Sequence, residues 1–316
     1  MTSLRTITLG TRGSALARCQ TELVLGELQR LHPGRSFSLK VIATLGDRAS
    51  EVPFERLEGE GVFVKELEAA LLNKEVDLAV HSLKDLPTGS TPGLALAAFP
   101  QRGEVRDVLV CPRGHTLDNL PKGSRLGTSS PRRAIQLRAC RPDLEVLPIR
   151  GNVDTRLRKV EEGQFDAIVL AAAGLERLGR RERITQYLPP EVCLPAVGQG
   201  ALAVQARAGD AEVVALAASI DHPPTRLAVT AERAFLEALG GGCRIPIAAL
   251  GQVKGDVPST GSGLRLELEG LVAQEDGSRM LRARLTGEAS RPEKLGRALA
   301  DEMLAQGAAK LLRTKP

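Results

Sequence analysis

Three features of this 316-residue sequence predict an α/β fold followed by a smaller α+β part. Over the first two thirds of the chain, strand-like apolar segments alternate with segments of helical periodicity, which is typical of a mostly parallel sheet. Several of these apolar segments run into polar turns that open helices, where open α/β sheets bind ligands. From about Asp221 the order changes to a helix followed by alternating strands. The length exceeds what one hydrophobic core usually organises, so two or three domains are expected.

The first α/β unit is expected within residues 5–99. Strands are expected at 5–10, 36–43, 77–81 and 94–99, and helices at 14–31 and 62–73. The second of these helices carries Phe63, Leu67 and Leu71 on one face. The intervening residues 44–61 are charged, contain glycine and lack periodicity, so they are expected to form a lid loop over a functional site.

A second α/β unit is expected after a crossing at Pro100 and Gly103. Strands are expected at 107–111, 125–127, 144–149 and 166–170, and helices at 131–139 and 153–162. Residues 196–200 resemble a second crossing, after which the apolar residues 201–206 are expected to return to the first sheet. Two crossings predict a hinged, two-lobed body.

The remaining sequence predicts a small α+β domain. A helix is expected at 225–239, and leucines alternate with charges around 264–268 and 281–285. Asp276-Gly277 lies between these runs and is good hairpin turn chemistry, while Leu295, Leu299 and Met303 form the stripe of a closing helix. The expected domains are therefore 1–100 with 201–219, then 101–200, then 220–316.

Composition narrows the class of function. The formal net charge is +5, but aromatic residues make up only 2% and Trp is absent, which disfavours a nucleic-acid-binding protein that needs stacking platforms. The five cysteines are scattered without metal-ligand or redox spacing, so reduced thiols in the cytoplasm and no metal are expected. No signal-like or membrane-spanning apolar run is evident, so neither export nor a membrane partner is expected.

Three loops share a design suited to binding anions. Each follows a strand and opens a helix with a capping side chain beside an arginine: Thr11-Arg12-Gly13-Ser14, Thr128-Ser129-Ser130-Pro131-Arg132-Arg133, and Arg150-Gly151-Asn152-Val153-Asp154-Thr155-Arg156. Ser14, Ser130 and Asn152 are the expected N-caps, and Pro131 suits the first helical position. Free N–H groups at a helix start and a planar guanidinium both favour carboxylates. A lone arginine is usually a solvated surface charge, but the repeated setting predicts a cleft for a substrate with several carboxylates.

Two further residues stand out, each with an ordinary alternative. Asp85, in the segment His81 to Pro87, is either a turn residue, or the partner of Lys84, or a carboxylate that orients a pyrrole-like N–H or stabilises a developing positive charge. His81 alone is more often structural. Cys243 follows three glycines, which allow a bulky group to approach the backbone, although the usual fate of such a thiol is to be buried and inert.

In order and over nearly the full length, these segments resemble the porphobilinogen deaminase (hydroxymethylbilane synthase) family. The resemblance is carried by the arginine loops together with Phe63-Val64-Lys65-Glu66-Leu67-Glu68, His81 to Pro87, Pro195-Ala196-Val197-Gly198-Gln199-Gly200, and Gly241-Gly242-Cys243 with Pro246-Ile247. It implies two α/β domains like a type II periplasmic-binding protein and a third domain that carries the cofactor cysteine. It also implies a monomer.

The resemblance implies a transferase of tetrapyrrole (heme) biosynthesis. Such an enzyme joins four porphobilinogen molecules head to tail, releases ammonia from each, and hydrolyses the linear tetrapyrrole from a dipyrromethane cofactor that Cys243 holds as a thioether. Asp85 matches the catalytic aspartate, which can stabilise the cationic azafulvene. Whether Asp85 also transfers a proton is left open.

The resemblance also assigns the binding residues. Cofactor contacts fall on Cys243, Ser14, Lys84, Asp85, Thr128, Ser129, Arg132, Arg133, Arg150 and Gly151. Substrate contacts fall on Arg12, Ser14, Phe63, Arg150, Arg156 and Arg177, with Arg177 placed by spacing. The chain departs from the family at Glu60, where a lysine is frequent in the lid, and Arg56 is expected to supply some of the missing charge. A non-catalytic receptor that closes on a small carboxylated ligand is the alternative, which the Gly-Gly-Cys turn opposes.

Overall fold

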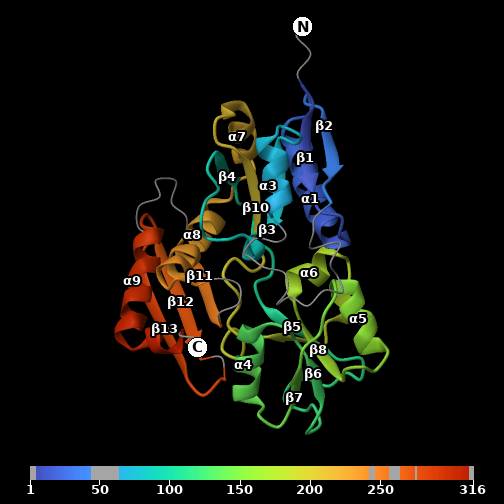
Figure 1. Cartoon of the computed structure of the whole chain (residues 1–316), viewed down its shortest axis with the longest axis vertical. Coiled ribbons are helices and arrows are strands. Elements are labelled where there is room, and N and C mark those ends of the chain that lie inside the picture. The colour runs from blue at the N-terminus through green and yellow to red at the C-terminus, as the bar shows by residue number, and fades with distance from the viewer. Residues whose placement is uncertain (1–4, 44–63, 242–245, 256–263, 275, 313–316) are drawn as a thin grey trace. The chain divides into compact units, whose positions relative to one another are not determined.

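The computed structural model describes residues 5–43, 64–241, 246–255, 264–274 and 276–312, which form three sheets (Figure 1). By the density of its contacts the chain divides into two compact units. Unit 1 comprises Met1–Gly103 with Ala201–Arg226, and unit 2 comprises Glu104–Gly200 with Leu227–Pro316. The chain therefore leaves unit 1 and returns to it, as the two expected crossings require. The expected lid at 44–61, with Arg56 and Glu60, lies outside the described residues, as do Phe63 and Cys243.

Unit 1 is built on a five-stranded sheet of order β2-β1-β3-β10-β4. Its strands are β1 (Ile7–Thr11), β2 (Phe37–Val41), β3 (Leu78–Ser82), β4 (Leu94–Ala98) and β10 (Leu202–Arg207). The first three run parallel, whereas β10 is antiparallel to both β3 and β4. The returning segment is thus inserted between two strands that precede it by a hundred residues or more, which confirms the predicted return to the first sheet.

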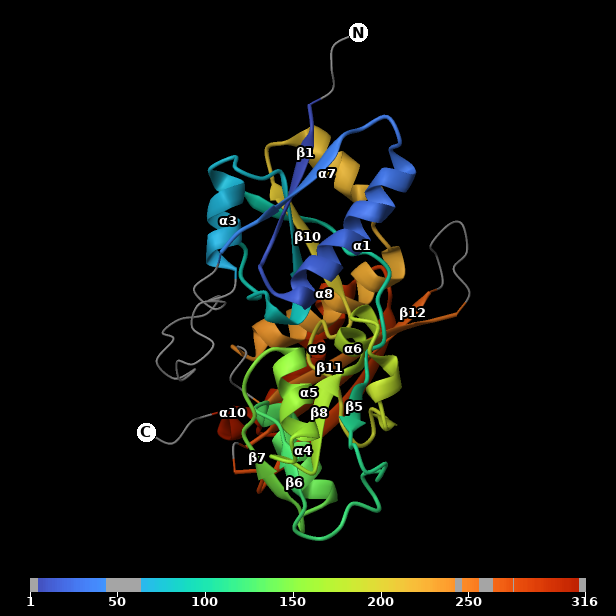
Figure 2. The same cartoon turned by 90° about the vertical axis from the view of Figure 1, so that its right-hand side faces the viewer.

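Helices cover both faces of this sheet. Residues of α1 (Ala15–Leu31) and α7 (Ala211–Ala218) pack on one face, and residues of α3 (Lys65–Leu72) pack on the other, as Figure 2 shows. Because each face is covered, the central strand β3 reads as a nearly continuous buried run rather than as an alternating one. A short 3-10 helix, η2 (Leu83–Asp85), follows this strand directly.

Unit 2 contains a second five-stranded sheet of order β7-β6-β8-β5-β9. Its strands are β5 (Asp107–Val110), β6 (Arg125–Gly127), β7 (Glu145–Leu147), β8 (Ala167–Ala171) and β9 (Gln186–Leu188). Here β6, β7 and β8 are parallel, and β5 is the antiparallel strand inserted next to β8. The helices α4 (Pro131–Cys140), on one face, and α5 (Val153–Glu161) and α6 (Ala172–Arg177), on the other, cover it, and η3 (Arg181–Arg183) precedes β9.

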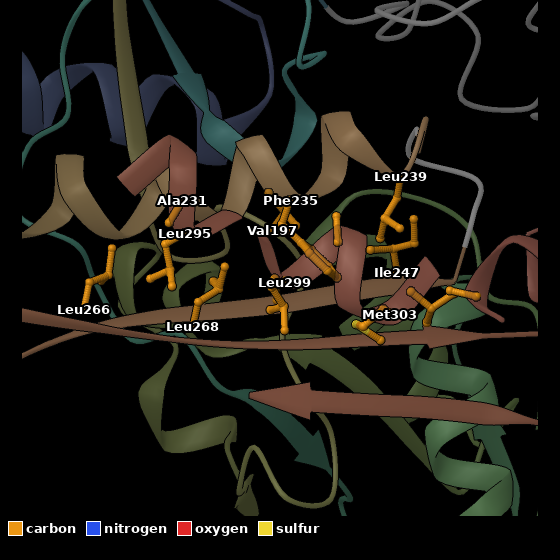
Figure 3. Packing of buried hydrophobic residues seen from close by; sticks show 14 of the residues in the cluster. Val197, Ala231, Phe235, Leu239, Ile247, Leu266, Leu268, Leu295, Leu299 and Met303 are labelled. Carbon is orange, nitrogen blue, oxygen red and sulfur yellow. The ribbon is translucent and has the colours of Figure 1, made fainter. Parts of the chain in front are cut away.

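The remaining sheet of unit 2 is antiparallel and has the order β11-β12-β13. Its strands are β11 (Ile247–Lys254), β12 (Arg265–Ala273) and β13 (Met280–Glu288), and its helices are α8 (Pro223–Ala238), α9 (Pro292–Ala305) and α10 (Ala308–Leu311). Figure 3 shows the core of this part, where Phe235 packs with residues such as Leu299. A Cβ at Gly270 would lie 2.6 Å from the Phe235 ring, so glycine is needed there.

The predicted fold class is confirmed, because two mixed α/β sheets and a small α+β part are present. Most predicted elements lie within about two residues of their expected ends. The hairpin at Asp276-Gly277 is present but longer than two residues, since β12 ends at Ala273 and β13 begins at Met280. The prediction missed five of the described helices and strands, which are α6, α7, α10, β9 and β11, and it also missed the 3-10 helices η2 and η3. The division into three domains stays a prediction. In the described part of the chain, no helix is long and apolar enough to cross a membrane.

We expect Phe235→Ala to lower the free energy of unfolding by about 3–5 kcal/mol, because it leaves a cavity in the fully buried core of the α+β part. Urea denaturation would measure the change. Met280→Ala, at a residue that is 38% exposed at the start of β13 in the same α+β part, should change stability by less than about 0.5 kcal/mol. Equal losses for the two variants would contradict this account of the core.

Candidate functional site

Four predicted site residues lie at the carboxyl edge of the unit 1 sheet. Arg12 and Ser14 follow β1, and Lys84 and Asp85 follow its parallel neighbour β3 in the 3-10 helix. The Ser14 hydroxyl accepts a hydrogen bond from the Ala17 amide at 3.3 Å, which confirms the predicted N-cap of α1. Asp85 is exposed, whereas Arg12 and Lys84 are half-buried. Unit 1 therefore presents two cations and a carboxylate at one edge, next to the free amides of a helix start.

Behind this edge lies a buried polar chain that the sequence did not indicate. The Gln205 amide donates to Glu68 Oε1 at 2.8 Å, so its oxygen faces His81 Nε2 at 3.1 Å. Since that oxygen can only accept, His81 Nε2 carries the proton. Burial lowers the pKa of His81 to about 4, with the charge of Arg12 contributing in the same direction and the Gln205 contact opposing it. His81 is therefore a neutral structural histidine at physiological pH, as the ordinary interpretation of a single histidine predicted.

The other predicted binding residues that the structure describes, apart from Arg177, lie at the carboxyl edge of β6, β7 and β8 in unit 2. Ser130 caps α4 by accepting from the Arg133 amide at 3.4 Å, with Pro131 at the helix start, and Asn152 caps α5 by accepting from the Thr155 amide at 2.9 Å. Both predicted caps are confirmed. Three parallel strands thus end at one edge, and two of the helices that follow them begin there with side-chain caps.

The hydroxyls of Thr128 and Ser129 form hydrogen bonds with the backbone at this edge. The Thr128 hydroxyl accepts from the Ser130 amide at 3.2 Å. The Ser129 hydroxyl donates to the Ile149 carbonyl at 2.7 Å and accepts from the Ile149 amide at 3.0 Å. These bonds join the loop after β6 to the loop after β7, so the two arginine-bearing segments are held side by side.

Arg132 and Arg133 are more buried than their place in a ligand-binding loop suggested. Their side chains are only 6% and 7% exposed, and both guanidinium groups bond to Asp107, which is fully buried at the start of β5. The distances are 2.7 Å from Arg132 Nη1 and 2.7 Å from Arg133 Nη2. The sequence prediction missed Asp107, although an acidic residue that opens the apolar strand segment Val108–Val110 is an available signal.

Arg156 is a half-buried cation at this edge, next to the like charge of Arg133. Burial, together with the neighbouring charge of Arg133, lowers its pKa to about 10. Its Nε donates to the Gly151 carbonyl at 2.8 Å, which orients the guanidinium. Gly151 has φ of 109°, and a Cβ there would lie 2.5 Å from Thr155, so glycine is required beside this arginine. The half-buried Arg156 beside the like charge of the buried Arg133 favours binding of a carboxylate.

The last two predicted arginines are placed differently. Arg150 is exposed in the loop before α5. Arg177 ends α6, and its Nη2 donates to the Gly200 carbonyl at 2.6 Å, so it contacts the second crossing segment. Among the described residues no group of three or more His, Cys, Asp or Glu could hold a metal ion, and the expectation that the chain needs no metal stays a prediction.

The fold and these edges define an α/β protein in which parallel strands lead into capped helix starts beside cationic side chains, a setting that favours anionic ligands. Comparison with protein families makes this specific: residues 7–215 match the family model described as "Porphobilinogen deaminase, dipyromethane cofactor binding domain", and residues 226–305 match "Porphobilinogen deaminase, C-terminal domain". The chain belongs to the porphobilinogen deaminase family. This membership confirms the predicted resemblance and favours the enzyme over the receptor.

Curated relatives support the same assignment over nearly their full length. The porphobilinogen deaminase of Roseiflexus castenholzii is 52% identical over 306 residues, which cover 97% of this chain and 98% of that protein. The porphobilinogen deaminase of Desulforudis audaxviator is 50% identical, with coverage of 98% and 97%, and that of Brevibacillus brevis is 48% identical, with coverage of 96% of each.

We expect His81 to make the protein less stable as the pH falls from about 7 to 4. The folded-state pKa of about 4 lies below the ordinary value of 6.5, so the stability that neutral His81 contributes is present above pH 6.5 and is lost as the pH falls through 4. The loss is about 3 kcal/mol. Urea denaturation of His81→Gln, which retains a donor for Gln205, should show a smaller acid loss than the wild type. His115→Gln, outside this network, should behave like the wild type, and identical acid profiles for all three proteins would refute the assignment.

Proposed function

We propose that this chain condenses four porphobilinogen molecules head to tail, releases ammonia from each, and finally hydrolyses off hydroxymethylbilane. Family membership supports the reaction class. The observation that carries the proposal in this chain is the gathering of cationic side chains and capped helix starts at the carboxyl edges of two sheets. Each porphobilinogen unit adds an acetate and a propionate, so the growing product needs many such anion sites.

The residues at these edges fit the carboxylates of a dipyrromethane cofactor. Arg156 is held beside the like charge of Arg133, which a bound carboxylate would relieve. Free amides of three helix starts add further donors. We assign cofactor contacts to Ser14, Lys84, Asp85, Thr128, Ser129, Arg132, Arg133, Arg150 and Gly151, with a thioether from Cys243. When bound, the cofactor supplies a primer ring with a free α-carbon that acts as the nucleophile.

Asp85 is the residue that we assign to the chemistry. When the aminomethyl carbon of porphobilinogen loses ammonia, positive charge develops on the pyrrole, and a carboxylate close to the pyrrole N–H stabilises it. Asp85 is suited to this because it is exposed at the end of β3, while the neighbouring side chains Arg12 and Lys84 are cationic. A new carbon–carbon bond then forms as the α-carbon of the preceding ring attacks, and that carbon loses its proton.

The remaining side chains position the reactants. We assign substrate carboxylates to Arg12, Ser14, Arg150, Arg156 and Arg177, and packing against a pyrrole ring to Phe63. Holding two rings in a productive orientation contributes to the rate apart from any charge stabilisation. We further propose a three-domain, cytoplasmic monomer that binds neither nucleic acid nor membrane.

Intact mass spectrometry tests the cofactor attachment. The purified wild-type chain should be heavier than its sequence by two pyrrole units, and Cys243→Ser should have the mass of its sequence alone, because the thioether cannot form. Cys140→Ser, a change at an exposed thiol, should retain the added mass. An active wild-type protein of unmodified mass would remove the cofactor from the proposal.

Asp85→Asn tests the catalytic carboxylate. We expect a folded protein whose kcat for tetrapyrrole formation falls by about 10²–10³-fold, because the amide cannot stabilise the developing cation as a carboxylate does. The formation of the tetrapyrrole from porphobilinogen would be followed by absorbance. Asp301→Asn, which neutralises an exposed carboxylate on α9, should keep wild-type turnover. Near-normal kcat for Asp85→Asn would take this residue out of the chemistry.

A further inference from the structure

A single buried carboxylate collects an unusual number of donors at the carboxyl edge of the unit 2 sheet. Asp107 Oδ1 accepts from Arg133 Nε at 2.9 Å, from Arg133 Nη2 at 2.7 Å and from Gln199 Nε2 at 3.0 Å. Asp107 Oδ2 accepts from Arg132 Nη1 at 2.7 Å and from the Cys193 thiol at 3.3 Å. A carboxylate has about four lone-pair sites, so Asp107 is saturated and its orientation is determined by its surroundings.

This carboxylate determines how the two arginines can point. Arg133 gives Nε and Nη2 to Asp107, and its Nη1 donates to the Val169 carbonyl at 3.1 Å. Arg132 directs Nη1 towards Asp107 and towards the Leu194 carbonyl at 2.6 Å. A guanidinium is planar and rigid, so fixing one edge of it also fixes the direction of its remaining N–H groups.

The position of Asp107 in the sheet brings this restraint to the anion-binding edge. Asp107 is paired with Ala171, the last residue of β8, on the antiparallel strand β5. Its charge therefore lies where the parallel strands β6, β7 and β8 end. Arg133 connects the two environments, because it bonds to Asp107 on one side and its charge acts on Arg156 on the other.

We propose that Asp107 is a positioning residue, which holds Arg132 and Arg133 in the orientation that receives the carboxylates of the cofactor and of the growing pyrrole chain. This inference rests on the proposed function. It adds a residue that touches neither cofactor nor substrate and acts only through the two arginines. The charges then alternate from Asp107 through Arg133 to a ligand carboxylate and on to Arg156.

Stability alone does not account for this cluster. Well-packed apolar residues in place of a buried ion triad are often as stable or more stable, because the charges no longer have to be desolvated. A buried carboxylate is required, however, if the two guanidinium groups must remain charged, nearly water-free and fixed in direction. The cluster therefore suits anion binding better than it suits folding.

A double-mutant cycle between Asp107→Asn and Cys243→Ser separates positioning from folding. Cys243→Ser removes the cofactor. If Asp107 is purely structural, Asp107→Asn should therefore lower the melting temperature equally in the wild-type chain and in Cys243→Ser. If Asp107 positions the arginines, Asp107→Asn should lower the melting temperature more in the chain that carries Cys243, because the misplaced arginines hold the cofactor less tightly and the bound cofactor then stabilises the folded chain less than in the wild type. We also expect a smaller cofactor-bearing fraction by intact mass and a KM for porphobilinogen that rises about tenfold, with a smaller change in kcat.

Asp166→Asn is the matched control. Asp166 also pairs with an arginine of the same sheet, Arg125 at 3.1 Å, but it precedes β8 and so lies at the opposite end of that strand from Ala171. Its variant should keep the wild-type cofactor fraction and KM. Equal melting losses in the two backgrounds, with cofactor fraction and KM of Asp107→Asn unchanged, would overturn the inference.

If Asp107→Asn does not fold, a variant that keeps the charge tests whether Asp107 positions the two arginines. Asp107→Glu retains the carboxylate but moves it by one methylene, so positioning predicts a raised KM, and a wild-type KM would overturn the inference. A wild-type chain without the added cofactor mass would instead refute the proposed function before any Asp107 variant is compared, so the two failures are distinguishable.

Discussion

The burial of charge at one sheet edge is the constraint on which much of unit 2 depends. Arg132 and Arg133 can be buried only because Asp107 accompanies them, since an unpaired charge in such a setting is strongly disfavoured. Attraction to the two guanidinium groups outweighs burial and holds the pKa of Asp107 well below its usual range. Burial, and to a smaller extent the same carboxylate, raises the pKa of the Cys193 thiol to about 12, so that thiol stays protonated. One acid thereby joins β5, the start of α4 and the segment that leads to the second crossing.

The two α/β sheets have the same arrangement of strands. In each, three parallel strands are joined by an antiparallel strand inserted beside the third, and an outer strand follows it. Parallel strands end at a common edge, where helix starts offer unpaired amides and a favourable dipole for anions. In unit 1 this edge carries the exposed carboxylate of Asp85, whereas in unit 2 the carboxylate of Asp107 is buried and pairs with Arg132 and Arg133.

Sequence periodicity missed several elements because each lacks either a contrast between its two faces or sufficient length. β11 is buried along its first five residues, on both faces, so it does not alternate. α7 is rich in alanine and valine and shows little contrast between its faces, and α6 has only six residues. Periodicity detects an element that has one buried and one solvated side, as β12 and α5 have at least in part, and it is weak where tertiary packing covers both.

The sequence by itself determined the fold class, the caps at Ser14, Ser130 and Asn152, and the family, because these depend on local chemistry and on ordered motifs along the chain. Only the tertiary structure decided which partner each charged side chain has. Asp107 and Arg133 are 26 residues apart, and His81 meets Gln205 across 124 residues. Sheet register and helix packing bring such groups together, and burial and neighbouring charges then set their protonation, so neither property can be read from neighbouring residues alone.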